Sequence, residues 1–123
     1  MRKMNAYRNT DKDIHVRMYR FVIGCFRDVV KKTPKTPENI PIIGQISASL
    51  TSMGANDTEA DAASSKRDFI AKYTIVRKET RETYYWLCMI RDTGILDRTL
   101  VEPYINECGE IRNIVSSIID HSR

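Results

Sequence analysis

The feature that most constrains this chain is a regular seam of side chains in its third quarter. The seam residues recur in alternating steps of four and three, and they are Phe69, Tyr73, Val76, Thr80, Thr83, Leu87 and Ile90. Because an α-helix repeats every 3.6 residues, such positions share one face. A sustained seam of this kind is typical of helices that pack lengthwise against other helices. The sequence therefore predicts a helix over residues 65–93.

Three further segments carry a similar amphipathic pattern, and we expect helices over residues 11–32, 37–62 and 97–121. Their seams are Ile14, Met18, Phe21, Cys25 and Val29; then Ile43, Ile46, Leu50 and Met53; and finally Val101, Tyr104, Cys108, Ile111, Val115 and Ile118. Helices often begin after a side chain that accepts a backbone hydrogen bond. Such residues stand at the predicted starts, and they are Asp11 or Asp13, Thr36, Ser65 and Asp97. Gly94 is typical of a helix end.

These four helices are joined by short links, which place consecutive helices side by side and antiparallel. We therefore expect an all-α fold, an antiparallel up-down-up-down four-helix bundle over residues 11–123 with left-handed, coiled-coil-like packing. The length of 123 residues fits one such domain. Residues 1–10 are expected to form a flexible N-terminal segment.

Several apolar side chains lie outside the single face of a helix that a bundle core would bury. On the third predicted helix they are Ile70, Tyr84, Tyr85, Trp86 and Met89. A helix that is apolar on more than one side indicates a partner surface. We expect self-association, with Tyr84, Trp86 and Met89 at the interface between copies. Stacking of the aromatic rings on nucleic-acid bases is an alternative.

The net charge of +4 is unevenly distributed, with basic residues gathered on the first and third predicted helices. Cations attract phosphate, so these residues are candidates for binding RNA or DNA. The candidates are Arg17, Arg20, Arg27, Lys31, Lys66, Arg67, Arg77 and Arg81. The alternative is an ordinary solvated surface, because Asp68, Glu79 and Glu82 partly neutralise the third helix.

No pattern of catalytic or metal-ligating residues is visible. A di-iron bundle needs Glu-x-x-His pairs, and neither His15 nor His121 follows a glutamate at that spacing. Cys25, Cys88 and Cys108 are widely spaced within apolar helical patterns, which favours neither a disulfide framework nor a zinc site. We expect no catalytic, cofactor-binding or metal-binding residues and no small-molecule substrate, so the chain is not expected to be an enzyme.

Polar residues gather where the second predicted helix meets the third. We interpret Asn56, Glu59, Ser65 and Arg67 as a structural junction, in which Asn56 and Glu59 satisfy free N–H groups at the start of the third helix. An acidic pocket for a cation or ligand is the alternative, with Asp57 and Asp61 among its residues.

The first residues are basic but precede no apolar run typical of a signal peptide. No segment reaches the roughly 20 apolar residues that a membrane-spanning helix needs. We therefore expect a cytoplasmic protein that does not insert into a membrane.

Several short motifs, in order, carry a resemblance to a known family. They are Thr51–Asn56 with Glu59 and Ala60, Ser65–Ile70, Lys78–Leu87, Asp92–Leu96 and Cys108–Ile119. Over about residues 14–120 the chain resembles the intervening-sequence proteins of bacterial 23S ribosomal RNA genes. It is distantly similar to the accessory subunits of diversity-generating retroelements. One departure is Ala48-Ser49-Leu50, where the family often has Arg-Ser-Gly, so one basic residue is missing there.

The resemblance implies a stand-alone four-helix bundle that assembles as a barrel-shaped homopentamer. It also implies that basic surfaces are candidates for nucleic-acid binding. We therefore expect a non-enzymatic, homo-oligomeric helical scaffold or interaction protein. The alternative is a nucleic-acid-binding accessory protein that presents basic faces around a ring-shaped oligomer.

Overall fold

A computed structural model describes residues 13–123, and in this part of the chain it contains helices and no β-strand. The elements are α1 (Ile14–Cys25), a π-helical segment η1 (Phe26–Val30), α2 (Ile40–Asp61), α3 (Lys66–Asp92) and α4 (Arg98–Ser122). The prediction of an all-α chain with four helices is therefore confirmed for the described residues. The predicted flexible segment, residues 1–10, lies outside them, as does Asp11.

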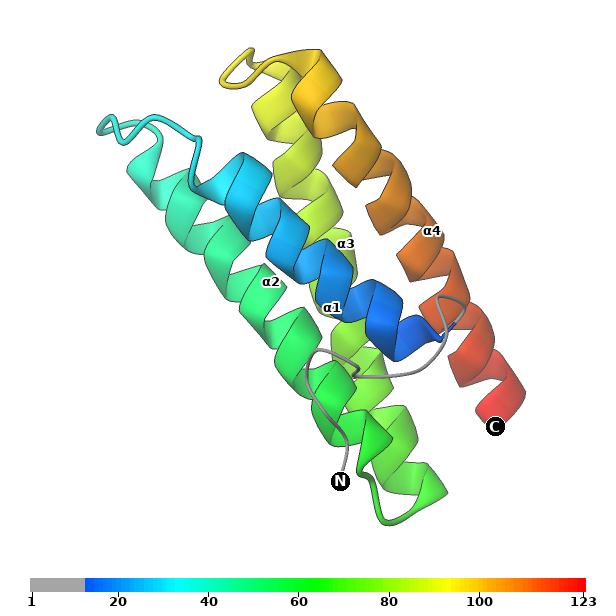
Figure 1. The fold of residues 1–123 in the computed structure, drawn as a ribbon. Helices are drawn as coiled ribbons and strands as arrows, with labels where there is room; N and C mark the ends of the chain where they lie inside the picture. Colours follow the sequence, from blue (N-terminus) through cyan, green and yellow to red (C-terminus); the bar gives the residue numbers. More distant parts are fainter. Residues whose placement is uncertain (1–12) are drawn as a thin grey trace.

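Each helix packs against its neighbours along the chain, and α1 also packs against α4. Figure 1 shows the chain reversing direction at each link, with α1 in front of α3 and between α2 and α4. This order brings the end of α2 and the start of α3 to the same end of the molecule as the start of α1. The predicted left-handed, coiled-coil-like packing stays a prediction.

The start of α1 agrees with one of the two predicted caps. Asp13 precedes the helix in extended conformation, and its side chain accepts a 2.8 Å hydrogen bond from the backbone N–H of His15. The helix predicted to about residue 32 ends at Val30, and its last turn is π-helical. Within this wider turn the two consecutive valines, Val29 and Val30, are both buried.

The second helix begins three residues later than predicted. The carbonyl oxygen of Thr36 accepts bonds from the N–H groups of Asn39 and Ile40, so residues 37–39 form a turn rather than the first helical turn. Asn39 occupies the N-cap position, and its side chain donates a 3.0 Å bond back to the carbonyl of Pro34. The prediction that Thr36 caps this helix is therefore wrong.

The boundaries of α3 and α4 agree closely with the predictions. The Ser65 hydroxyl accepts a 3.0 Å bond from the N–H of Asp68, and Asp97 accepts a 2.8 Å bond from the N–H of Thr99. Gly94 ends the α3 turn with a φ of 73°, a conformation that favours glycine because it lacks a Cβ.

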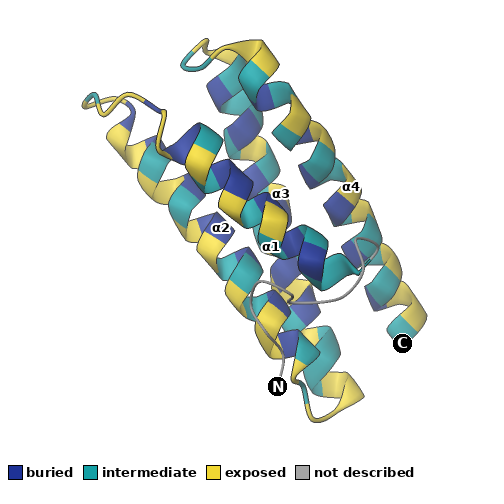
Figure 2. Ribbon diagram, in the orientation of Figure 1, coloured by how far each residue is buried: buried dark blue, intermediate teal, exposed yellow. Residues whose placement is uncertain are grey.

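The core lies between the four helices, and Figure 2 shows the buried residues on the faces that the helices turn toward one another. Six of the seven predicted seam residues of α3 are buried, and Phe69 is half-buried. In α4 the prediction is wrong at two positions. Ile105 and Ile119 are buried, whereas Tyr104 and Ile118 are only half-buried. None of the helices in the described part of the chain is long and apolar enough to cross a membrane.

Candidate functional site

The outer α3 face is the surface of α3 that points away from the core. Its exposed residues again recur in steps of four and three, and they are Arg67, Ala71, Thr74, Lys78, Arg81 and Tyr85. The spacing matches that of the buried seam, so this face runs along most of the helix. It combines cations with small side chains and ends at an aromatic ring.

The predicted phosphate-binding residues of α3 are free of ion pairs in the described part of the chain. Lys66, Arg67 and Arg81 are exposed, and Arg77 is half-buried. The salt bridges of α3 involve other residues, such as Lys72 with Glu59 at 3.0 Å and Arg91 with Glu102 at 3.0 Å. The cations of the outer α3 face are therefore available to an external anion.

The predicted cations of α1 are different, because carboxylates already engage them. Arg17 donates to Glu107 through Nη2 at 2.6 Å and Nε at 3.1 Å, and to Glu110 at 3.2 Å. These bonds, chiefly that to Glu107, raise the pKa of Arg17. Arg27 pairs with Asp28 at 3.0 Å. Arg17 and Arg27 are thus structural ion-pair residues as much as surface cations.

The other two α1-side candidates lie at the surface. Arg20 is exposed and interacts with another group of the protein, so it is not a free cation. Lys31 is exposed just after η1, and it has no ion pair within the described residues. The predicted phosphate-binding cations therefore fall into two groups. Most of those without an ion pair among the described residues lie on α3.

The predicted interface residues do not form one surface. Tyr84 turns toward α4, where the Arg112 guanidinium lies 4.9 Å from the centre of its ring. Trp86 is two residues further on, about 200° around the helix, so it faces away from Tyr84. All three predicted residues, Tyr84, Trp86 and Met89, are half-buried in the isolated chain. Tyr84 and Trp86 therefore lie on different faces of α3, and their place at an interface between copies stays a prediction.

Among the aromatic residues that the structure describes, the most exposed is one outside the predicted interface set. Tyr85 has 59% of its surface exposed, and its ring meets that of Trp86 edge-on with 4.8 Å between centroids. The Trp86 indole N–H is satisfied within its own helix, where it donates to Glu82 at 3.3 Å. Ile75 is also exposed, at 38%. It lies 14 residues before Met89, which is close to four helical turns, so both lie on the same side of α3.

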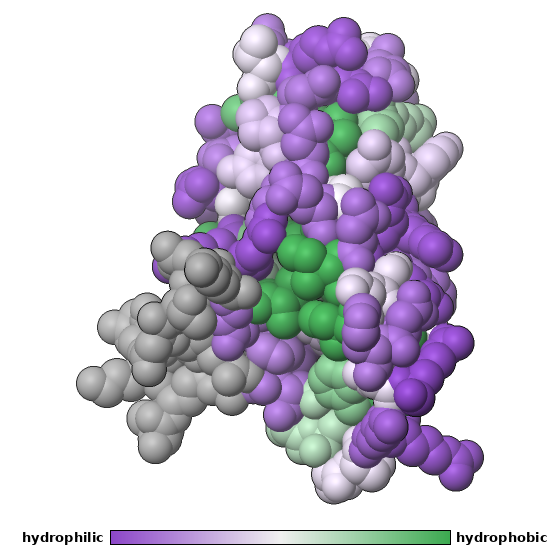
Figure 3. Space-filling model, turned by 90° about the vertical axis from the view of Figure 1, so that its right-hand side faces the viewer, coloured by the Kyte–Doolittle hydropathy of each residue, from purple (hydrophilic) through white to green (hydrophobic). Residues whose placement is uncertain are grey.

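Another side of the molecule also shows both hydrophilic and hydrophobic surface. Figure 3 views the molecule from the right-hand side of Figure 1, and hydrophilic residues cover most of that side. A hydrophobic area interrupts them near the middle of the view. Polar side chains therefore leave some apolar surface of the isolated chain uncovered.

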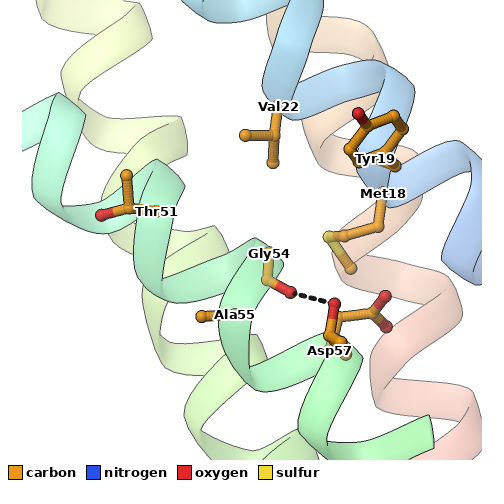
Figure 4. Close-up of a pocket in the computed structure, with 8 residues that line it drawn as sticks. Met18, Tyr19, Val22, Thr51, Gly54, Ala55 and Asp57 are labelled. Atoms are coloured by element: carbon orange, nitrogen blue, oxygen red, sulfur yellow. Dashed lines mark hydrogen bonds between the residues drawn. The ribbon is translucent and has the colours of Figure 1, made fainter. Parts of the chain in front are cut away.

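An apolar groove lies between α1 and α2, with a volume of about 260 Å³. Figure 4 shows Met18, Tyr19 and Val22 of α1 facing Thr51, Gly54, Ala55 and Asp57 of α2. Gly54 lies near Val22 across the groove, where an added Cβ would make an ordinary van der Waals contact at 3.7 Å with a Val22 methyl group. The groove offers van der Waals contact and little hydrogen bonding.

The structure corrects the predicted polar junction. Ser65 does cap α3, but Asn56 donates to the carbonyl and hydroxyl of Ser52, one turn earlier in its own helix. Glu59 pairs with Lys72 rather than with the start of α3. Arg67 is exposed and has no ion pair among the described residues. These residues therefore do not form one junction, because Asn56 bonds within α2, Glu59 pairs with Lys72, and only Ser65 caps α3.

The polar residues that do meet at this end include Asp57 and Asp61 of the alternative acidic pocket, but their contacts with His15 and Tyr73 were not predicted. Asp57 is only 2% exposed, and its Oδ1 accepts a 2.7 Å bond from the Tyr73 hydroxyl of α3 and lies 2.8 Å from Nδ1 of His15. His15 Nε2 lies 3.4 Å from Oδ1 of Asp61. Burial and the nearby Asp57 carboxylate raise the pKa of Tyr73, so the tyrosine stays a hydrogen-bond donor. We call these four residues the His15 cluster.

Two of the three thiols, those of Cys25 and Cys108, are buried. Burial raises the pKa of Cys108 to about 12 and raises that of Cys25, while Cys88 is half-buried. A thiol with a raised pKa is a poor nucleophile and a poor metal ligand. Within the described residues no group of three or more His, Cys, Asp or Glu side chains is arranged to hold a metal ion.

Comparison with known proteins points to one family. The family model for the 23S rRNA-intervening sequence protein matches residues 10–117. A similar solved structure is that of a protein of unknown function from the S23 ribosomal protein family of Bacteroides thetaiotaomicron VPI-5482. It is 32% identical, has a TM-score of 0.74, and the match covers 87% of this chain and 98% of that chain. A comparison with curated proteins gave no match.

The family match spans nearly all of the described helices, and the solved relative shares their fold. The resemblance noted in the sequence is thereby confirmed. The chain belongs to the 23S rRNA-intervening sequence protein family.

Proposed function

We propose that this protein is a non-enzymatic helical scaffold that works by associating with copies of itself. The observation that carries this proposal is the apolar surface of α3. Tyr85 and Ile75 are 59% and 38% exposed, and Trp86 and Met89 are half-buried on the same helix. Aromatic residues and methionine are enriched at protein–protein interfaces.

The energetics favour covering this surface. Burying apolar area contributes about 25 cal/mol per Å², and large aromatic residues offer the most area for the least loss of side-chain freedom. The cations Lys78 and Arg81 stand beside Tyr85 on the same face, where a polar rim is typical of interfaces. The Trp86 indole is already hydrogen-bonded to Glu82, so its burial would leave no donor unsatisfied.

We propose a homopentamer as the stoichiometry, supported by the family resemblance, with each subunit an up-down-up-down bundle packed in the left-handed manner. A cytoplasmic location is part of the same proposal. It is supported by the absence, in the described helices, of any segment able to span a membrane.

Two substitutions on α3 and one control substitution on α1 test the interface. Tyr85→Ser and Trp86→Ser remove apolar surface from α3, whereas Ile23→Ser removes a residue of 42% exposure from α1. Light scattering should report a lower assembly mass for the two α3 variants and an unchanged mass for Ile23→Ser. Circular dichroism checks that each variant is folded. An unchanged mass in folded Tyr85→Ser and Trp86→Ser would refute the proposed interface.

A second function, nucleic-acid binding, is favoured by one specific observation. The α3 cations Arg67, Arg77 and Arg81 have no ion pair among the described residues, and Tyr85 supplies an exposed ring one helical turn after Arg81. Cations bind phosphate and aromatic rings stack on bases, so this surface suits a single strand of RNA or DNA. Repetition around an oligomer would multiply the effect.

Salt dependence separates this function from simple scaffolding. Affinity for RNA should fall steeply between low and physiological salt, and Arg77→Ala with Arg81→Ala should reduce the slope by about one for each lost phosphate contact. Lys32→Ala with Lys35→Ala is the control, because it removes the same charge from exposed residues outside α3. No retention of RNA or DNA at low salt would refute nucleic-acid binding. An equal effect of both pairs would refute the assignment to α3.

A further inference from the structure

A closed ring of identical subunits needs two different contact surfaces on each copy. A surface that pairs with itself joins two copies around a twofold axis and stops there. A ring of five instead places one surface of each subunit against a different surface of the next. With the exposed residues of α3 as one of these surfaces, as proposed above, each subunit must also carry the counterpart that receives them.

A long part of the exposed side of α2 carries no charge. We call its exposed residues Gly44, Ala48, Thr51 and Ala55 the outer α2 face. Between residues 40 and 58 the one charged side chain is Asp57, which is only 2% exposed. By contrast, α1 exposes Arg20, and α4 exposes Glu110 and Asp120. Because the cores of interfaces are depleted in charged residues, the outer α2 face suits the centre of a contact between subunits.

The two outer faces are also complementary in charge. The charged residues of segment 36–65 are all acidic, and they are Glu38, Asp57, Glu59 and Asp61. Of these, Glu38 and Glu59 are exposed on either side of the outer α2 face, and Glu59 also pairs with Lys72 of its own subunit. The charged residues exposed on α3 up to Tyr85 are instead all basic, and they are Lys66, Arg67, Lys78 and Arg81.

This difference in charge selects the partner surface. Opposite charges steer two surfaces together, whereas like charges that face each other are unfavourable. Two outer α3 faces would bring cations against cations. An outer α3 face and an outer α2 face would instead bring cations to a surface whose centre is neutral and whose ends are acidic.

We propose that the outer α3 face of one subunit docks on the outer α2 face of the next, so that each copy supplies both halves of the contact. Within the bundle α2 and α3 pack against each other, and each turns its exposed side away from the shared core. The two outer faces therefore point toward different sides of the subunit, as a ring requires. This contact rests on the pentamer proposed above, and it is the surface through which the ring closes.

A hydrogen bond between the two helices fixes which residues stand at the same height. Ser49 Oγ of α2 lies 2.7 Å from Thr83 Oγ1 of α3, so residues 48–51 are level with residues 81–85. In a ring whose axis runs along the helices, neighbouring copies also stand level with one another. Arg81 and Tyr85 of one subunit then meet residues 48–51 of the next. Tyr85, with 59% of its surface exposed, is the aromatic anchor of this contact.

Light scattering on the full chain tests the contact through its α2 half. Ala48→Arg places a cation where Arg81 of the next subunit arrives, so it should lower the assembly mass to that of one subunit. Asn113→Arg is the matched control, because it adds the same charge at an exposed position of α4 and should leave the mass unchanged. An unchanged mass for folded Ala48→Arg, or an equal loss for Asn113→Arg, would overturn the proposed contact. Thr51→Lys makes the same test if circular dichroism shows that Ala48→Arg does not fold.

Mixing two defective variants tests the two-surface arrangement itself. Tyr85→Ser keeps an intact outer α2 face, and Ala48→Arg keeps an intact outer α3 face. Together they retain one working contact, so their mixture should contain a species of two subunits that neither variant forms alone. A mixture that contains only single subunits would overturn the proposed contact.

The outcome also separates this contact from self-association in general. A wild type that remains a single subunit would refute the proposed self-association and this contact with it. A wild type that assembles, and that loses mass with Tyr85→Ser but not with Ala48→Arg, would leave self-association in place and overturn the α2 surface alone.

Discussion

Gly24→Ala is the substitution for which the structure makes the sharpest prediction. An added Cβ would lie 2.9 Å from the hydroxyl oxygen of Tyr104, closer than real contacts allow, and 3.0 Å from its Cε1, which is tighter than most real contacts. Tyr104 cannot move without consequence, because its hydroxyl donates a hydrogen bond to Asp28 and its ring packs 6.3 Å from that of Phe21. The substitution therefore forces α1 and α4 apart or displaces the tyrosine.

The expected magnitude combines two opposing effects. Replacing glycine by alanine inside a helix ordinarily stabilises it by about 1 kcal/mol. Losing a hydrogen bond to a charged group costs about 1.5–3 kcal/mol. The net result should be a loss of about 0.5–2 kcal/mol, which lowers the melting temperature by up to several degrees in a domain of this size. In a Tyr104→Ala background the clash is absent, so Gly24→Ala should stabilise instead.

The assay is urea unfolding of the wild type, the two single variants and the double variant. Gly44→Ala serves as the control, because nothing lies within 4 Å of its added Cβ and only the stabilising effect remains. Stabilisation by Gly24→Ala in the wild-type background would show that α1 does not approach α4 as described. The same conclusion would follow if the sign did not change when Tyr104 is removed.

Three other predictions concern a core leucine, an ion-paired carboxylate and the three cysteines. Leu87→Ala should cost about 2–5 kcal/mol in urea unfolding because the side chain is fully buried, and a loss below about 0.5 kcal/mol would contradict the assigned α3 face. The Arg27 guanidinium, with the Tyr104 hydroxyl, lowers the pKa of Asp28 to about 2. The stabilisation from this carboxylate is therefore present above its unfolded value of about 3.9 and is lost as the pH falls toward 2, and acid titration of Asp28→Asn should lack that loss. In the folded chain a thiol reagent should modify Cys88 before the two buried cysteines, which mass spectrometry of the labelled peptides can check.

The helices could be predicted from sequence because their apolar spacing is a local property. The α3 seam from Tyr73 to Ile90 was predicted correctly for this reason. The α4 seam was misjudged by one position at Ile105 and Ile119, which stand four residues after the buried Val101 and Val115. A step of four residues departs from a full helical turn by about 40°, whereas a step of three departs by about 60°. The late start of α2 depends on backbone bonds to Thr36, which no spacing pattern reveals.

The polar contacts were harder to predict because their partners are remote. Arg17 looked like a free cation, but its carboxylate partner Glu107 stands 90 residues later in the chain. The His15 cluster did leave one signal, since Asp57 occupies a seam position of α2 between the buried Met53 and Ala60. A carboxylate at such a position needs a buried donor, and sequence alone could not identify His15, which lies 42 residues away.

Sedimentation velocity of the purified wild-type chain over a wide concentration range tests the proposed self-association most directly. The account predicts a single assembly whose mass is five times that of the 14.2 kDa subunit. A species with the mass of one subunit at every concentration would contradict it.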